Sequence, residues 1–171
     1  MMQTVIDAIT KVLSLFLIFL MAVIVLDVTW QVFTRFILKD PSSFTEELAG
    51  FLLIWIGLLG ASYAFYTRAH LGIDILTMRL NPEKKRLVGM LIALIVFLFA
   101  FFVLVIGGLR LVNLTFTLHQ ISAAIGIPMG YVYLVLPLTG LLMMIYAVYF
   151  IFVLWKQQGL LPEEHKITIV D

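Results

Sequence analysis

The sequence predicts an all-α integral membrane protein with four transmembrane helices. Of its 171 residues, 63% are hydrophobic and only 12% are charged, which is too little polar surface to coat a soluble domain of this size. The apolar residues gather in four runs, and each run exceeds the roughly 20 residues that a helix needs to cross about 30 Å of hydrocarbon. Charged or turn-forming residues bound each run, so we expect spans at 12–38, 45–67, 87–113 and 129–155.

The charge and cysteine content exclude several functional classes. The formal charge of +1 comes from 11 basic and 10 acidic residues, with no basic block that could neutralise a run of phosphates, so we expect no nucleic-acid partner. The chain has no cysteine, which excludes disulfides, thiolate metal sites and cysteine nucleophiles. We expect no catalytic residue, cofactor or metal site in this chain, which we interpret as a single membrane domain over 1–171.

The first span begins after Lys11 and could be mistaken for a signal peptide. No small-residue cleavage site follows, and hydrophobicity resumes through Leu38, so we interpret it as a retained helix. The next few residues contain Pro41, which breaks the helix, and serines, which can accept hydrogen bonds from the first amides of a new helix.

Asp27 lies near the middle of the first span, where an ionised carboxylate is costly. With Gln31 and Arg35 it forms an intramembrane polar stripe at steps of four residues, which stack on one face of a helix, so we expect this face to look toward other helices. An ion or proton site is the functional alternative. We favour interhelical hydrogen bonding, because a lone acid lacks the unwound helix and clustered oxygens with which transporters hold ions.

Two glutamates open the second span. Ser43 and Glu46 have the spacing of a capping box, which accounts for Glu46 without a function. Glu47 remains, and Arg35 ends the preceding helix on the same side of the membrane. We therefore expect a structural ion pair between Arg35 and Glu47 or Glu46.

The second span also carries a stripe of small residues, at steps of seven, four and three, that would let another helix approach closely. Its members are Gly50, Gly57, Ala61 and Ala64. The spacing predicts a packing face but leaves open whether the neighbour belongs to this chain or to another subunit.

A polar connection, Arg68, His70 and Asp74, follows the second span. The residues 71–80 mix apolar and polar side chains before Asn81 and Pro82, which favours a short interfacial helix. A histidine and an aspartate four apart could contribute to a metal site, but two candidate ligands without a second pair do not indicate one.

Between the third and fourth spans, the residues 121–128 are apolar but contain Gly126 and Pro128, which predicts a turn pressed on the membrane surface. Pro137 should kink the fourth span. The expected aromatic anchors at the two interfaces are Tyr131, Tyr133 and Trp155.

The orientation follows from the lysines and arginines of the short loops, which stay cytoplasmic. Eight of them fall on the side of the termini and three on the other, so we expect both termini, including a short polar tail at 156–171, in the cytoplasm. The eight are Lys11, Arg68, Arg79, Lys84, Lys85, Arg86, Lys156 and Lys166, and the three are Arg35, Lys39 and Arg110.

The order of these features over nearly the whole chain resembles the small membrane subunit of TRAP transporters, the tripartite ATP-independent periplasmic family. The motifs that carry the resemblance are Arg35, the stretch 44–48 with Trp55 and 59–61 beyond it, the stretch 70–74, and later Gln120, Ile127, Pro128, Tyr133, Leu136 and Pro137. One departure is Phe44, where many members look to have tryptophan.

The resemblance implies an inner-membrane uptake system of three parts: a periplasmic substrate-binding protein, a large membrane subunit that moves substrate with sodium, and this small subunit among the membrane lipids. The implied substrates are organic acids such as C4-dicarboxylates, sialic acid or other sugar acids. The small subunit would scaffold the large one and help to dock the binding protein. Sodium coupling would reside in the large subunit.

The resemblance also implies roles for individual residues. Arg35 with Glu46 or Glu47 would fix the first two helices, His70 and Asp74 would order the cytoplasmic connection, and an outer loop near the docking surface would be shaped by Gln120, Pro128 and Tyr133. Two other functions stay open. One is a small proton-coupled homodimeric exporter that uses Asp27, and the other is the membrane anchor of a respiratory complex, although no histidine lies inside a predicted span.

Overall fold

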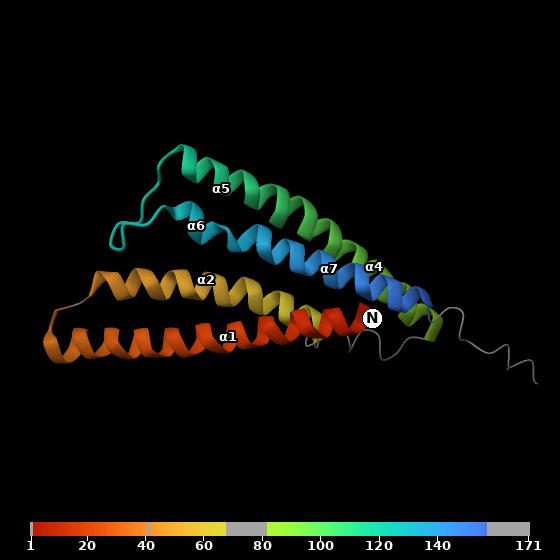
Figure 1. Ribbon diagram of the computed structural model, residues 1–171, viewed down its shortest axis with the longest axis horizontal. Helices are drawn as coiled ribbons and strands as arrows, with labels where there is room; N and C mark the ends of the chain where they lie inside the picture. Colours follow the sequence, from red (N-terminus) through yellow and green to blue (C-terminus); the bar gives the residue numbers. More distant parts are fainter. Residues whose placement is uncertain (1, 41, 68–81, 157–171) are drawn as a thin grey trace, which may run out of the picture.

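The computed structural model describes residues 2–40, 42–67 and 82–156, and these residues are almost entirely helical (Figure 1). Four of its helical stretches are long and apolar enough to cross a membrane, which confirms the predicted fold class. They cover Gln3–Leu38, Ser43–Tyr66, Lys84–Thr117 and Met129–Lys156. The first stretch starts nine residues earlier than predicted (12 − 3), because the polar residues before Lys11 continue the helix without a break.

The first two spans form an antiparallel hairpin. Helix α1 (Met2–Phe33) continues into a π-helical segment (Thr34–Leu38), and α2 (Ser43–Tyr66) returns along it. The π-helical segment ends at Lys39, whose φ of 55° is left-handed, and Thr34 O accepts from the backbone amides of Lys39 and Asp40. A short connection therefore reverses the chain.

The last two spans form a second hairpin. Its first arm is one continuous rod made of α4 (Pro82–Phe99), a π-helical segment (Ala100–Gly107) and α5 (Gly108–Thr117). Its second arm consists of α6 (Met129–Tyr133) and α7 (Val135–Lys156). The second arm is interrupted at Leu134, as the position of Pro137 predicts, because proline has no amide to donate to the carbonyl of Tyr133.

The two hairpins form a wedge (Figure 1). They meet near the N-terminus, which we call the terminal end, and they diverge toward the end that carries Lys39, Asp40 and the connection 118–128, which we call the loop end. Helix α7 is the central element, since it packs on α2 as well as on both helices and the π-helical segment of the rod. Helix α1 packs mainly on α2.

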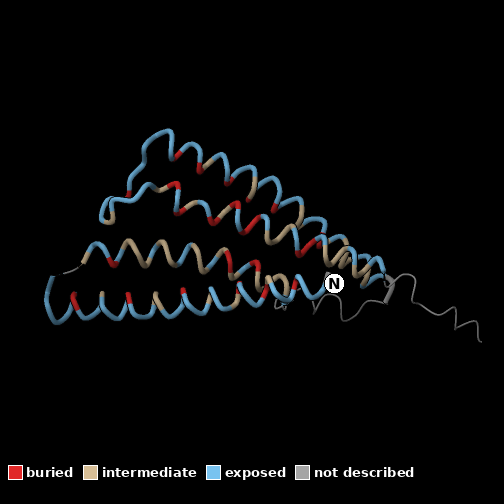
Figure 2. The backbone as a smooth tube through the Cα atoms, in the orientation of Figure 1, coloured by how far each residue is buried: buried red, intermediate tan, exposed pale blue. Residues whose placement is uncertain are grey.

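A seam with a period of seven residues holds α1 on α2. The buried residues of α1 and its π-helical extension include Ile6, Leu13, Leu20, Asp27 and Thr34. A seven-residue repeat keeps one face of a helix against its neighbour, as in coiled coils. Figure 2 shows short buried stretches recurring along α1, separated by exposed and half-buried ones.

The expected polar stripe follows this seam only in part. Asp27 is buried and Gln31 is half-buried, but Arg35 is exposed. Each step of four residues turns the side chain by about 40° and each step of seven by about −20° at 3.6 residues per turn. Two steps of four residues therefore turn Arg35 by about 80° relative to Asp27, away from the face that contacts α2.

The second hairpin is held by close approach at three glycines. A Cβ on Gly108 would lie 2.8 Å from Leu136 Cβ, and one on Gly140 would lie 2.9 Å from Leu104 Cβ and 3.1 Å from the Ala100 carbonyl oxygen. A Cβ on Gly130 would lie 2.5 Å from the ring of Phe116. No larger residue fits without displacing the neighbouring arm, so these glycines set the distance between the arms.

At the terminal end, side chains from α1, α2 and α7 join the two hairpins. The Tyr66 hydroxyl donates to Asp7 Oδ1 at 2.7 Å, and the hydroxyls of Thr10 and Tyr146 lie 3.2 Å apart. The rings of Tyr66 and Tyr146 have centroids 4.9 Å apart. This cluster fixes the narrow end of the wedge.

Candidate functional site

At the loop end, the carboxylate of Glu47 binds the loop between α5 and α6. The Ser122 hydroxyl and the Ala124 and Ile125 amides donate to Glu47 Oε2 at 2.8, 2.8 and 2.9 Å. The Ala123 amide donates to Oε1 at 3.1 Å. One carboxylate of the first hairpin thus binds four donors of the second, and we call this group of residues (Glu47 and 122–125) the Glu47 clasp.

The conformation of the loop explains how four donors converge. Ile121 and Pro128 form an antiparallel bridge, and Ser122 N donates to Ile127 O at 2.9 Å. Gly126 closes the tight turn between them with a φ of +77°, a conformation that favours glycine. Successive amides of such a turn point into one concavity and form an anion-binding nest.

A second hydrogen bond links the hairpins one level deeper. The indole Nε1 of Trp55 donates to the Val132 carbonyl at 3.1 Å, which connects α2 to α6. The helix is interrupted at Leu134, so the Val132 carbonyl lies in the last turn of α6, where a continuing helix would otherwise supply its donor. The interruption near Pro137 therefore leaves acceptors that a side chain of the first hairpin can use.

Glu47 does not have the partner that we expected. Among the described residues, neither Glu47 nor Glu46 forms an ion pair with Arg35. Both Arg35 and Glu46 are exposed, and the Glu47 oxygens are used by the loop. The predicted ion pair is wrong because the actual partners of Glu47 lie 75 to 78 residues away in the sequence.

The helix cap also shifts by one residue from the capping box that we expected. Ser42, not Ser43, is the N-cap of α2, and its hydroxyl accepts from the Thr45 amide at 3.4 Å. Thr45 donates its own hydroxyl to the Ser42 carbonyl at 3.0 Å. Glu46 therefore lies in the first turn of α2 without closing a capping box with Ser43.

The small-residue stripe of α2 does not pack within this chain. Gly50, Gly57 and Ala61 are exposed, and Ala64 is half-buried. A Cβ added at Gly50 or Gly57 would meet no atom within 4 Å. The described part of the chain thus leaves an open face, which we call the glycine face (Gly50, Gly57, Ala61 and Ala64), on the side of α2 that is turned away from its neighbours.

Asp27 is buried in the α1–α2 seam with 9% of its surface exposed. Its Oδ2 atom has no hydrogen-bond partner. The second buried side-chain oxygen without a partner in the described residues is the hydroxyl of Thr139 on α7. The seam therefore contains an acid whose charge nothing in the described residues balances.

The expected docking residues lie at the loop end. The backbone of Gln120 accepts from the Met129 amide at 2.9 Å, and its side chain is exposed. Pro128 precedes α6, and Tyr133, which is half-buried, is the last residue of α6. Gln120 and Pro128 thus flank the Glu47 clasp.

The expected connection of Arg68, His70 and Asp74, and the interfacial helix expected at 71–80, lie outside the described residues. Within the described ranges, no group of three or more histidine, aspartate or glutamate side chains could hold a metal ion.

Fold and site define the class: a polytopic helical membrane protein of two helical hairpins, in which one carboxylate of the first hairpin fixes the loop that joins the two arms of the second. The model of a protein family described as "Tripartite ATP-independent periplasmic transporters, DctQ component" matches residues 24–157. The chain belongs to this family. The match includes the Glu47 clasp, the glycine face and the whole second hairpin.

Curated relatives carry the same assignment. The sialic acid TRAP transporter small permease protein SiaQ of Vibrio cholerae is 41% identical over 68 residues, 40% of this chain and 39% of its own length. The C4-dicarboxylate TRAP transporter small permease protein DctQ of Rhodobacter capsulatus is 32% identical over 103 residues, 57% of this chain and 43% of its own.

A longer relative is the sialic acid TRAP transporter permease protein SiaT of Haemophilus influenzae, 34% identical over 119 residues. The match covers 67% of this chain but only 18% of SiaT. For all three relatives, the chain spans less than half of their length. The family makes the chain a small permease subunit of a TRAP transporter, a multi-pass protein of the bacterial inner membrane and a transport component rather than an enzyme.

Proposed function

We propose that this chain is the scaffold subunit of a sodium-coupled uptake system for an organic acid, a C4-dicarboxylate or a sugar acid such as sialic acid. In this proposal it packs side by side with a large membrane subunit that carries substrate and sodium. Its loop end faces the periplasm and helps to dock the substrate-binding protein.

The observation that carries the proposal is the glycine face of α2. In a bilayer, helices associate through close packing of small residues, since lipid tails are as apolar as the side chains they would replace. Gly50 and Gly57 have open space where a Cβ would be, so the backbone of α2 is accessible to a helix of another subunit. The glycine face supports a lateral partner.

The longer relative supports the identity of that partner. The region similar to this chain is less than a fifth of the Haemophilus influenzae permease protein. We infer that the rest of that polypeptide includes the large subunit, joined to its small subunit in one chain. A small subunit that can be fused to a large one must lie beside it in the membrane.

The orientation rests on the distribution of positive charge. Five of the eight lysines and arginines in the described residues lie toward the terminal end, and such residues stay in the cytoplasm: Lys11, Lys84, Lys85, Arg86 and Lys156. The loop end then faces the periplasm. There the Glu47 clasp holds the loop at 122–125 in one conformation, and a preordered loop lowers the entropic cost of docking a protein.

The substrates named for the relatives set the class that we propose. Sialic acid and C4-dicarboxylates are both carboxylic acids. The two names disagree on the individual compound, so the proposal is limited to the class.

Co-purification tests the scaffold role. The tagged chain, expressed in its native host and purified in mild detergent, should recover one large polytopic subunit in equal amount. Gly57→Leu fills the glycine face and should reduce that recovery about tenfold, the effect of losing about 1.4 kcal/mol of association. Ala22→Leu, which places the same leucine side chain at an exposed position of α1, is the matched control. Undiminished recovery with Gly57→Leu would contradict the proposed interface.

An exporter that works alone is the second candidate function, because Asp27 is a buried acid with an unpartnered oxygen. It would act through protonation of that acid. Purification of the chain only as a homodimer, with transport in vesicles that lack any other protein, would support the exporter and exclude the scaffold.

A further inference from the structure

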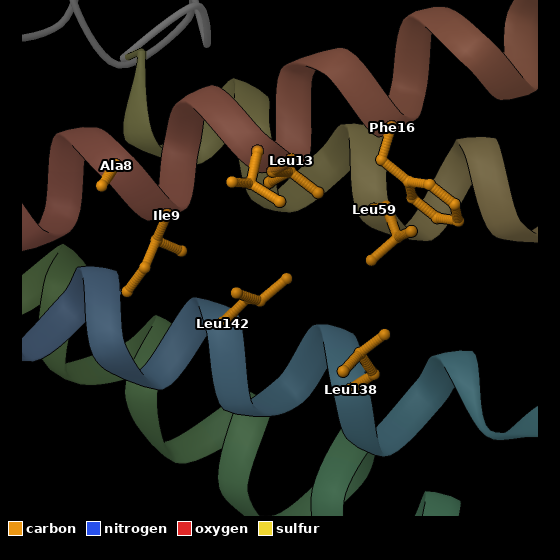
Figure 3. A pocket seen from close by; sticks show the side chains of 8 residues that line it. Ala8, Ile9, Leu13, Phe16, Leu59, Leu138 and Leu142 are labelled. Carbon is orange, nitrogen blue, oxygen red and sulfur yellow. The ribbon is translucent and has the colours of Figure 1, made fainter.

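A groove opens between α1 and α7 in the wedge, nearer to the terminal end (Figure 3). Its two walls come from α1 and α7, and Leu59 of α2 lies between them as the floor. Leu59 and Leu13 are buried, whereas Val12 and Leu138 at the rim are exposed. The groove is therefore closed toward α2 and open toward the bilayer.

The size and lining of the groove limit what it can hold. Its volume is about 400 Å³, and all of its lining side chains are apolar. A dry cavity of about 150 Å³ binds the six carbons of benzene, so this volume suits roughly 16 carbons. A transmembrane helix with side chains is about 10 Å wide and would not enter a space of this size. A single hydrocarbon chain matches both the volume and the chemistry.

The outer limit of the groove is set by Phe16. Its ring makes an edge contact with Trp55, with centroids 6.4 Å apart, and Trp55 is held by its hydrogen bond to the Val132 carbonyl. Phe16 points into the groove in Figure 3. A hydrocarbon chain lying along α1 would therefore end against a fixed aromatic pair.

A positive charge lies next to the lining residues in the sequence of α1. Lys11 is exposed and lies between the lining residues Ala8 and Val12 in the sequence, and it is the last charged residue before the uncharged stretch 12–26. The nearby acid Asp7 accepts a hydrogen bond from Tyr66 at 2.7 Å. An ammonium group at the edge of the hydrocarbon complements a phosphate whose acyl chain enters the groove.

We propose that this groove is a lipid site that binds one acyl chain of an anionic phospholipid, with the lipid phosphate beside Lys11. The lipid lies between α1 and α7, on the open side of the wedge, where the two hairpins do not pack on each other as α2 and α7 do. This inference depends only on the chain itself, and it stands whether or not the proposed large subunit is recovered.

Native mass spectrometry of the full chain tests the proposal. Purified protein in a mild detergent micelle is titrated with phosphatidylglycerol or with phosphatidylcholine of the same acyl chains. We expect one lipid to be retained, with phosphatidylglycerol preferred. Ala8→Phe and Val12→Phe occupy the groove and should reduce retention about tenfold, whereas Ala22→Phe, on an exposed face of the same helix, should not.

Lys11→Gln tests the headgroup separately. It should reduce the preference for phosphatidylglycerol about fivefold, the factor expected for one lysine at an anionic surface, and leave phosphatidylcholine binding unchanged. Helix content and thermal midpoint are measured for each variant. Val12 lines the groove from its exposed rim, so the ring in Val12→Phe enters the groove without displacing a buried side chain, and we expect this variant to keep its fold.

Equal retention by Ala8→Phe, Val12→Phe and Ala22→Phe would overturn the site, and an unchanged preference in Lys11→Gln would overturn the assignment of the headgroup. The titration is repeated on the complex with the large subunit. Retention of the lipid there supports the proposal, while its displacement would assign the groove to a protein partner and overturn it.

Discussion

The two hairpins use glycine in opposite ways. In the second hairpin, a Cβ on Gly108, Gly130 or Gly140 would lie between 2.5 and 2.8 Å from its nearest side-chain neighbour. In the first, a Cβ on Gly50, Gly57 or Gly60 would meet nothing within 4 Å. The same residue type closes the packing inside one hairpin and leaves the surface of the other open. A small-residue pattern therefore identifies a packing face without identifying the neighbour.

The difference extends to how the hairpins are buried. Helix α7 packs on α2 of the first hairpin and on the rod of the second. Its fully buried residues include Val135, Thr139, Tyr146 and Ala147. Helix α1 is buried mainly along one seven-residue seam. The fourth span is thus the most buried of the four, whereas α1 offers most of its surface to lipid and to other proteins.

Gly140→Leu should have the largest effect on folding. The added side chain would meet Leu104 and the Ala100 carbonyl, and the backbone of the rod cannot move aside as a flexible side chain could. Over-packing of this kind costs about 1–3 kcal/mol or more. We expect a lower thermal midpoint and a loss of monodisperse protein in fluorescence-detected size-exclusion chromatography.

Gly57→Leu is the matched variant for this comparison. It adds the same side chain where no neighbour lies within 4 Å. The thermal midpoint of the isolated chain should therefore equal that of the parent protein. Equal destabilisation by the two substitutions would show that the hairpins do not differ in the way described.

Glu47→Ala should have an intermediate, local effect. It removes the acceptor of three backbone amides and the Ser122 hydroxyl, and the freed donors would turn to water. We expect amide hydrogen exchange at Ala123, Ala124 and Ile125 to become about tenfold faster, with the helical spans unaffected.

Glu46→Ala is the control for the clasp, because Glu46 lies one residue away and is exposed. It should leave exchange in the loop unchanged. If both variants accelerated exchange equally, the effect would come from the charge near the start of α2 and not from the hydrogen bonds of Glu47.

Asp27→Asn should have the smallest effect. It keeps the shape of a side chain in the seam and removes the cost of a buried charge, so stability should change by less than about 1 kcal/mol or rise slightly. Recovery of the large subunit should equal that of the parent chain. Loss of transport in vesicles that contain only this chain would instead support Asp27 as a coupling acid.

The sequence was sufficient to predict the four spans, the turn around Gly126 and the interruption near Pro137. Each of these depends on a local property of the sequence. The spans depend on the length of an apolar run, the turn on a glycine that adopts a left-handed φ, and the interruption on the amide that proline lacks. The two π-helical segments were not predicted, because Thr34–Leu38 and Ala100–Gly107 carry no residue pattern that distinguishes them from α-helix.

The candidate site was predicted less well. Glu47 was singled out, but a plausible charge partner in the neighbouring helix was chosen over backbone amides more than 70 residues away. Charge complementarity can be seen in a sequence, whereas a nest of amides exists only once the loop has folded. The signal that could have identified it was the turn itself, since Gly126 and Pro128 already predicted a turn between the third and fourth spans.

The length of α1 has a consequence for the surrounding bilayer. The stretch Gln3–Leu38 has 36 residues and is therefore about 54 Å long, against about 30 Å of hydrocarbon. Tilting and protrusion from the headgroup region accommodate such a mismatch. Because α2 shares a seam with this stretch but forms a span that is 12 residues shorter (36 − 24), a change of membrane thickness shifts the inclination of the two spans together. Bilayer thickness thereby acts on the angle at which this hairpin presents itself to a neighbouring protein.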